Sequence, residues 1–170
     1  VLSGKVYLNG EDITGLKTKR IIAKGINYLP EDRFLNGIFK LTTVRNNITS
    51  ITLTTLKRML INTVQEKSLA KKYIDEFHIK VTGDGQIMGS LSGGNQQKVI
   101  IGRCFSTNPH LVILDEPTRG VDAGARSDVY AIIKELKKTG VAILLISSDM
   151  EEIITMSDRV VTMYRGRINH

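Results

Sequence analysis

Tryptophan is absent from this 170-residue sequence, aromatic residues make up only 5% of it, and cysteine occurs once. Aliphatic side chains must therefore form most of the hydrophobic core. A single cysteine excludes an internal disulfide and fits a reducing compartment. Because Cys104 lies in the apolar register of an expected helix, we interpret it as a buried core residue rather than a reactive thiol.

Long apolar runs are also missing from the chain. The longest, Val141 to Ile146, is far shorter than the roughly 20 residues that a membrane-spanning helix needs. Its length instead predicts a buried strand. The sequence therefore indicates a globular domain with no membrane span of its own.

Charge of neither sign is concentrated. The net charge is +7, but lysine and arginine are dispersed along the chain. They form no dense basic run, and aromatic residues are not interleaved with them as a base-stacking surface would require. We therefore interpret the basic balance as solvated surface and expect no nucleic-acid partner.

Strands and helices are expected to alternate along the chain. Strands are expected at 5–8, 26–29, 111–115, 141–147 and 159–164, with a last short strand after a turn at 165–166, and helices at 12–13 with 17–24, 44–51, 56–77, 95–107, 125–138 and 151–156. This order predicts an α/β fold with a parallel sheet covered on both faces. We expect one domain over 1–170, with 1–41 and 106–170 as its α/β core and 42–105 as an inserted helical subdomain.

Two short motifs carry most of the chemical information. Ser92-Gly93-Gly94 opens an expected helix, where free backbone N–H groups make an anion site. Asp115-Glu116 ends a buried strand, so one carboxylate could hold Mg²⁺ and the other could act on water. Each motif alone is more often a helix cap or a solvated strand exit, and only their combination indicates a site.

The carboxyl ends of the expected parallel strands bring further polar residues to the same edge. Glu31 follows strand 26–29, and Ser148 follows strand 141–147. Ligands of parallel α/β sheets gather at this edge. We therefore expect Glu31, Asp115, Glu116 and Ser148 to lie near one another.

In this order and spacing the motifs resemble an ATP-binding-cassette (ABC) ATPase. Leu91 to Lys98 (LSGGNQQK) is similar to the signature motif, Leu111 to Glu116 to the Walker B strand, and Gly120 to Asp122 to the D-loop. The resemblance implies a P-loop NTPase-like fold that binds ATP and Mg²⁺.

The resemblance also implies roles for individual residues. Asp115 would hold Mg²⁺, Glu116 would be the general base for attack on the γ-phosphate, and Asp122 would couple two sites. The signature would face ATP held by a second ATPase half, arranged head to tail with this one. The expected nucleotide-binding residues are Leu91, Ser92, Gly93, Gly94, Asn95, Gln96 and Asp122.

Further segments match one branch of the family: 28–33 (YLPEDR), LSGGNQQK, 115–125 (DEPTRGVDAGA), 147–149 (SSD) and 156–160 (MSDRV). Through them nearly the whole chain resembles the second ATPase half of the ATP-binding subunit of bacterial monosaccharide importers of the ribose and galactose type. Two departures from a general ABC ATPase are usual in that half: Glu31 stands at the Q-loop position and Ser148 at the switch position. Ionised Glu only accepts hydrogen bonds, and Ser cannot carry the charge of His. Both residues are still expected at the catalytic site, but they predict a weak hydrolytic site.

The phosphate-binding Walker A motif is missing from the chain. Gly10 and Gly15, and also Gly89 and Gly94, have its glycine spacing, but no Lys-Ser or Lys-Thr follows either pair. Because the chain begins at Val1 rather than Met, we expect a fragment of a longer subunit, truncated at its N-terminus. The isolated chain is expected to be inactive.

The resemblance implies further partners and a location. We expect transmembrane permease subunits to contact residues 31–39 and the helical subdomain, and a periplasmic or lipoprotein sugar-binding protein to act indirectly. The subunit would lie peripherally on the cytoplasmic face of the inner membrane. Two alternatives stay open: a non-transport ABC protein acting on ribosomes or DNA, and a non-hydrolytic binding fragment.

Overall fold

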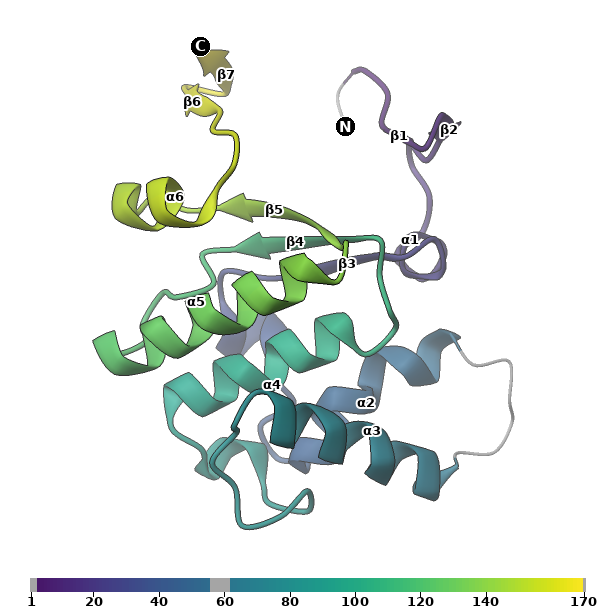
Figure 1. The fold of residues 1–170 in the computed structure, drawn as a ribbon. Coiled ribbons are helices and arrows are strands. Elements are labelled where there is room, and N and C mark those ends of the chain that lie inside the picture. Colours follow the sequence, from purple (N-terminus) through teal and green to yellow (C-terminus); the bar gives the residue numbers. More distant parts are fainter. Residues whose placement is uncertain (1–2, 56–61, 170) are drawn as a thin grey trace.

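A parallel sheet of three strands forms the centre of the computed structural model, which describes residues 3–55 and 62–169 (Figure 1). Its strands are β3 (Ile26–Leu29), β4 (Leu111–Asp115) and β5 (Ala142–Ile146), with β4 in the middle. Two small antiparallel hairpins flank the sheet in sequence. They are β1 (Tyr7–Leu8) with β2 (Glu11–Asp12), and β6 (Thr162–Tyr164) with β7 (Arg167–Asn169).

Helices α4 and α5 lie along one side of the sheet, and α2 and α3 lie beyond α4 (Figure 1). Short helical turns at Arg33–Gly37 and Met88–Ser90 connect these elements. No helix in the described part of the chain is long and apolar enough to cross a membrane. The helices are α1 (Thr18–Ala23), α2 (Val44–Thr55), α3 (Thr63–Glu76), α4 (Gly93–Phe105), α5 (Ala123–Lys138) and α6 (Met150–Met156).

The two faces of the sheet differ, and this corrects the expectation that both would be covered. Val112 and Leu114 of β4 are completely buried against the helices. On the opposite face, Tyr28 is 51% exposed and Leu144 is 50% exposed. The sequence also predicted a buried strand at 141–146. Both predictions fail because side chains alternate between the faces, and the described helices α4 and α5 cover only one of them.

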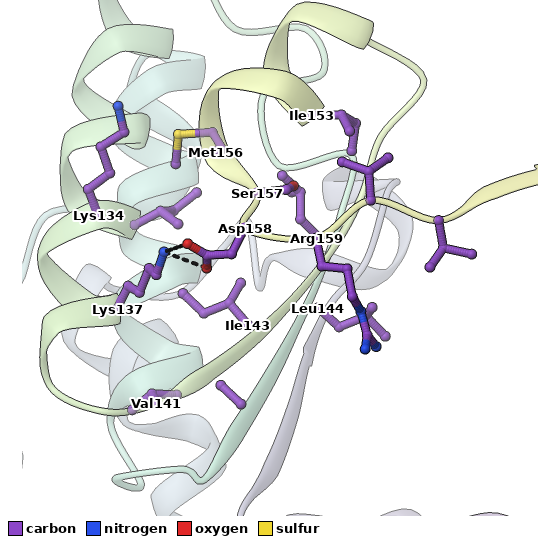
Figure 2. A pocket seen from close by; sticks show the side chains of 15 residues that line it. Lys134, Lys137, Val141, Ile143, Leu144, Ile153, Met156, Ser157, Asp158 and Arg159 are labelled. Carbon is purple, nitrogen blue, oxygen red and sulfur yellow. Dashed lines mark hydrogen bonds and ion pairs between the residues drawn. The ribbon is translucent and has the colours of Figure 1, made fainter. Parts of the chain in front are cut away.

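The outer edge of β5 borders a cavity of about 410 Å³. Figure 2 shows that α5, β5 and the segment after α6 surround it, with Ile143 and Leu144 from the strand. The Lys137 ammonium donates to the Asp158 carboxylate at 2.5 Å beside it. None of the residues expected at the functional site lines this cavity.

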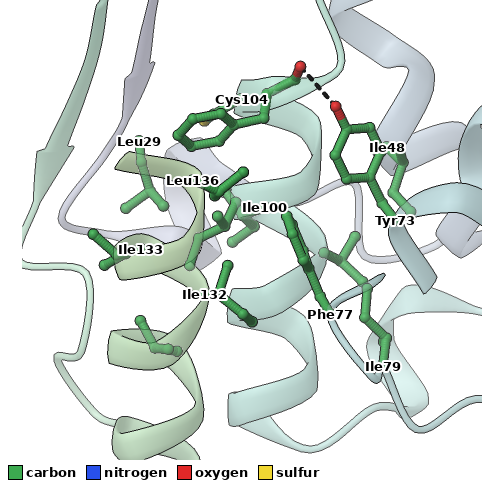
Figure 3. Close-up of a cluster of buried hydrophobic side chains, with 14 of the residues drawn as sticks. Leu29, Ile48, Tyr73, Phe77, Ile79, Ile100, Cys104, Ile132, Ile133 and Leu136 are labelled. Carbon is green, nitrogen blue, oxygen red and sulfur yellow. Dashed lines mark hydrogen bonds between the residues drawn. The ribbon is translucent and has the colours of Figure 1, made fainter. Parts of the chain in front are cut away.

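Helix α4 lies at the centre of the hydrophobic core (Figure 3). Its residues Ile100, Ile101 and Cys104 have exposures of 1% or less. Figure 3 shows the Tyr73 hydroxyl bonded to the Phe105 carbonyl, at 2.8 Å, while burial raises the pKa of Tyr73 to about 12. One continuous cluster of buried residues joins the sheet with α2, α3, α4 and α5.

Several expected boundaries differ from the observed ones. Asp12 belongs to strand β2 rather than to a helix, because β2 pairs with β1. Segment 31–37, for which no helix was expected, contains a helical turn that begins after Asp32, whose carboxylate accepts the Phe34 and Leu35 N–H groups. The expected strand at 159–164 is limited to Thr162–Tyr164. Of the helix expected at 56–77, residues 56–61 lie outside the described part, and α3 begins at Thr63.

The burial of Cys104 predicts slow chemistry at its thiol. Burial raises the pKa of Cys104 to about 11, and its Sγ atom has no exposed path to solvent in a residue of 0% exposure. Because the thiolate is the reactive form, labelling by a thiol reagent at about pH 8 should be slow until the chain unfolds. Labelling rates measured across a urea titration test this. Equal rates in the native and unfolded protein would contradict the assigned burial.

Candidate functional site

Glu116 is held between the ends of two neighbouring strands. Its N–H donates to the Ile146 carbonyl at 2.8 Å, and its Oε1 atom accepts the Ser148 N–H at 2.8 Å. The backbone of Glu116 is in the left-handed region, with φ of 48°, which costs energy in a residue with a side chain. The structure therefore brings Glu116 and Ser148 together, but through the Ser148 backbone rather than its hydroxyl.

Asp115, the last residue of β4, contacts the side chain of Tyr28 on the neighbouring strand β3. The Tyr28 hydroxyl donates to Asp115 Oδ2 at 2.7 Å. That hydrogen bond is the main cause of the raised pKa of Tyr28, followed by partial burial. Tyr28 therefore stays protonated and orients the carboxylate. Only the register of β3 against β4 reveals this contact, because residues 28 and 115 are far apart in sequence.

The carboxylate of Asp115 at this edge can supply only one of the several oxygen ligands that Mg²⁺ needs. In the described part of the chain, no three His, Cys, Asp or Glu side chains are grouped to hold a metal ion. Asp115 is one carboxylate at a strand end, and Mg²⁺ characteristically binds one or two carboxylates together with water and substrate phosphates. Asp115 therefore fits as one ligand of Mg²⁺, with water and substrate phosphates as the others.

Glu31 lies on the neighbouring loop and forms an ion pair with Arg119. The two side chains are 49% and 63% exposed, so the pair contributes little stability by itself. Arg119 is therefore paired with Glu31 while most of its side chain stays exposed to solvent. Glu31 reaches the predicted edge of the sheet, but its carboxylate is directed to this arginine.

The signature segment begins helix α4 at Gly93 rather than at the expected Asn95. Ser92 is the N-cap residue, but its Oγ atom accepts the Asn95 side-chain amide at 2.9 Å and caps no backbone N–H. Because the first turn of a helix has no intrahelical acceptors, its N–H groups stay available beside the exposed Ser92. The helix start expected from the sequence is present, and anion binding there stays a prediction.

Leu91 and Gln96 serve the packing of the signature segment. Leu91 is 8% exposed and Gln96 is 5% exposed. The Gln96 amide donates to the Leu91 carbonyl at 3.1 Å and reaches the Met88 carbonyl at 3.4 Å. Their side chains therefore lie inside the protein, which argues against the expectation that they contact nucleotide directly.

The signature and the expected D-loop lie against each other. A Cβ atom placed on Gly94 would lie 2.3 Å from the Cβ of Ala125, so only glycine permits this approach of α4 and α5. Asp122 caps α5, with Oδ1 accepting the Ala125 N–H at 3.0 Å. Ser92, Asn95 and Asp122 line a common cavity of about 290 Å³.

Lys98, the last residue of the signature, was not singled out from the sequence. Its side chain is only 5% exposed, and its ammonium donates to Asp128 Oδ2 at 2.7 Å. The hydrogen bond from Lys98 is the main reason that the pKa of Asp128 lies below its ordinary value. This ion pair fastens α4 to α5 beside the signature cavity.

Comparison with known protein families shows which family this chain belongs to. The family model described as ABC transporter matches residues 2–119. The chain belongs to the ABC transporter family. Similar curated proteins include the ribose import ATP-binding protein RbsA of Caldanaerobacter subterraneus, 43% identical over 98% of this chain and 34% of that protein. The xylose import ATP-binding protein XylG of Escherichia coli K12 is 37% identical, over 97% of this chain and 33% of that protein. The chain spans about a third of the length of these relatives.

Solved structures share the ABC ATPase fold. The ATP-binding cassette MJ1267 in its ADP conformation superposes with a TM-score of 0.79 at 26% identity, covering 98% of this chain and 68% of the cassette. A dimeric post-hydrolysis structure of the cassette MJ0796 bound to ADP and Pi gives a TM-score of 0.83 at 19% identity, covering 99% of this chain and 72% of that one. The predicted P-loop NTPase-like α/β fold is thereby confirmed.

The contact between Gly94 and Ala125 predicts a substitution that the core cannot absorb. Gly94→Ala should destabilise the chain by about 1–3 kcal/mol, because the added methyl must separate α4 from α5. Gly124→Ala is the matched control. Its Cβ would meet only Asp122 Oδ1, at 3.5 Å, so the change should stabilise by about 0.5–1 kcal/mol. Urea unfolding measures both, and equal effects would show that the helices do not meet at Gly94.

The ion pair of Lys98 predicts a pH-dependent effect. Asp128→Asn keeps an oxygen acceptor but removes the negative charge opposite the buried Lys98 ammonium, whose other acceptor among the described residues is the His78 carbonyl at 3.5 Å. The change should cost about 1–2 kcal/mol near neutral pH, reduced because Asp128 is half exposed. The folded pKa of Asp128 is depressed, so its contribution is present above the unfolded value of about 3.9 and lost as pH falls through the lower folded value.

The stability difference between the parent chain and Asp128→Asn should therefore vanish in acid. Asp75→Asn is the control, because Asp75 and its partner Lys71 are both largely exposed. Urea unfolding at a series of pH values gives the measurement. A difference that persists unchanged below the folded pKa would contradict the assigned pair.

Proposed function

We propose that the protein carrying this chain is the ATP-binding subunit of an ABC importer for a sugar, and that it hydrolyses ATP to drive transport. The support is the identity of 43% to a ribose import ATP-binding protein and 37% to a xylose import ATP-binding protein. The observation that carries the proposal is the geometry at the end of β4, where Asp115 and Glu116 are both held by groups from neighbouring strands.

The proposed chemistry follows from how these two carboxylates are held. Glu116 accepts the Ser148 N–H with one oxygen, which leaves the second carboxylate oxygen to orient water for attack on the γ-phosphate. Asp115 would contribute one ligand to Mg²⁺, which when bound neutralises charge on the phosphates. Tyr28 fixes the direction of the Asp115 carboxylate. These roles, and that of Asp122 as the coupling residue, are our assignments.

The signature is proposed to act on a second nucleotide. In the described part of the chain, no hydrogen bond or ion pair joins Ser92, Gly93 or Gly94 to Asp115 or Glu116. The exposed helix start instead suits an anion presented by another ATPase half arranged head to tail. The similar cassette MJ0796 was solved as a dimer bound to ADP and Pi, which supports such an arrangement.

Glu31 and Ser148 suggest an unequal division of labour between the two sites. Glu31 is engaged with Arg119, and Ser148 contributes its backbone N–H to Glu116. Neither supplies the positive charge that a histidine could place near a γ-phosphate. We therefore propose that this half hydrolyses ATP weakly and chiefly completes the ATP site of its partner half.

The proposed partners are transmembrane permease subunits and, indirectly, a sugar-binding protein. Leu35 is 81% exposed and Leu41 is 88% exposed, and Phe34 and Phe39 are also more than half exposed. Apolar side chains gathered on one segment are typical of protein contacts. We propose that residues 31–39, together with Leu41 and the proposed helical subdomain at 42–105, face the permease. The subunit would then lie peripherally on the cytoplasmic face of the membrane.

The isolated 170-residue chain is proposed to be a non-hydrolytic binding module, because it contains no Walker A motif. No observation favours action on ribosomes or DNA. Genes for a permease and a binding protein beside this one would support import, and their absence together with a ribosomal or DNA-repair neighbour would speak against it.

Two substitutions in the protein that carries this chain separate the proposed sites. Glu116→Gln should lower ATP turnover at this half by about 100-fold or more, because it removes the base that orients water. Ser92→Arg should instead lower nucleotide trapping at the partner half, because it blocks the exposed helix start. Trapping of nucleotide at each half measures both effects.

Glu135→Gln is the control for both, since within residues 3–55 and 62–169 Glu135 pairs with the exposed Lys138 alone. It should leave ATP turnover and trapping unchanged. If Ser92→Arg reduced trapping equally at both halves, the assignment of the signature to the partner site would be wrong.

A further inference from the structure

Arg33 reaches from the helical turn after β3 to the corner that precedes the D-loop. Its two terminal nitrogens donate to consecutive carbonyls, to Arg119 at 2.8 Å and to Gly120 at 3.1 Å. Bonds from a charged donor to backbone carbonyls are stronger than neutral ones. The side chain is half-buried, and the Phe34 ring lies 4.9 Å from its guanidinium carbon.

A second contact runs in the opposite direction between the same two segments. The Arg119 side chain pairs with Glu31, while the Arg119 carbonyl accepts from Arg33. Segments 31–34 and 119–120 are therefore linked by two arginines, one from each segment. They enclose a cavity of about 400 Å³ lined by residues from these two segments alone.

The guanidinium of Arg33 also lies against the signature glycine. A Cβ atom on Gly93 would meet the Arg33 Nη2 atom at 3.0 Å and the Gly120 carbonyl at 3.5 Å. The Nε atom of Arg33 is buried and has no hydrogen-bond partner among the residues that the structure describes. Leaving a charged group partly unpaired is costly, so an arginine serving only as surface charge would turn outward.

We propose that Arg33 is a positioning residue that sets the signature against the D-loop. It fixes Gly120, whose chain leads directly to Asp122, and it lies against Gly93 at the start of α4. The functional part of this proposal rests on the proposed function. Arg33 lies in the segment proposed to contact the permease, and it holds the signature and the D-loop, which are proposed to act on the partner half's nucleotide.

The planar fork of arginine is needed for this contact. Two terminal nitrogens reach two carbonyls at once, whereas a lysine ammonium is a compact single head that cannot hold both in fixed geometry. Arg33→Lys should therefore retain part of the hold on the two carbonyls. Arg33→Met keeps the aliphatic stem but has no donor, so it should retain none.

Hydrogen exchange in the isolated chain tests the positioning directly. In Arg33→Met, the hydrogen-bonded amides of Arg119 and Val121 should exchange about tenfold faster, and so should the Gln96 amide, which is bonded to the Ser92 carbonyl at the start of α4. Arg33→Lys should lie between Arg33→Met and the parent chain. Amides at the centre of α4 should be unchanged. The matched control is Arg45→Met, because Arg45 pairs with Asp84 at 2.9 Å in the helical region. Unchanged exchange at Arg119 and Val121, or equal acceleration throughout the chain, would overturn the proposal.

ATP turnover by the whole protein supplies a second readout. Arg33→Met should raise the KM for ATP about fivefold with a smaller change in kcat, since loosened signature and D-loop elements weaken nucleotide engagement rather than chemistry, and Arg33→Lys should partly rescue it. A loss in kcat at unchanged KM would overturn the positioning role. If the unmodified protein showed no turnover, the proposed function would fail, while the exchange experiment would still decide the role of Arg33.

Discussion

The pairing of β4 with both β3 and β5 determines which residues can meet in this protein. The strands are parallel, so Leu29, Leu114 and Leu145 lie side by side and the loops that follow all emerge at one edge. The Tyr28–Asp115 and Glu116–Ser148 hydrogen bonds exist only in this register. A shift by one residue would reverse every side chain and bring the carboxylates to the wrong face.

A second constraint is the close approach of α4 and α5. Gly94 leaves no room for a side chain beside Ala125, and the Lys98–Asp128 pair closes the same interface one turn further along. The signature and the Asp122 loop therefore form one surface rather than two. Arg33 adds a third link to that surface from the segment after β3. In the proposed function, the segment that contacts the permease is thus joined directly to the D-loop, because the Arg33 guanidinium donates to the Arg119 and Gly120 carbonyls.

Local patterns predicted much of this, and the failures have physical causes. Apolar runs predicted β3, β4 and β5, and the ordered motifs predicted the fold that the comparisons confirm. A continuous apolar run does not reveal how many faces of a strand are covered, so β5 was wrongly expected to be buried. Glycine is a poor helix former, which is why the start of α4 was expected at Asn95. Contacts such as that of Arg33 with Gly120 have no spacing signal, because they join segments distant in sequence.

We propose, as the central claim, that Asp115 and Glu116 bind Mg²⁺ and orient water, and that Leu91 to Lys98 is the signature of an ATPase. The phosphate-binding Walker A motif does not occur among the 170 residues. Calorimetric titration with Mg-ATP, performed on this chain and on the longer protein that carries it, tests the claim most directly. We predict tight binding by the longer protein and none by the chain alone. Tight binding by the 170-residue chain would contradict the account, because the chain would then bind nucleotide without a Walker A motif.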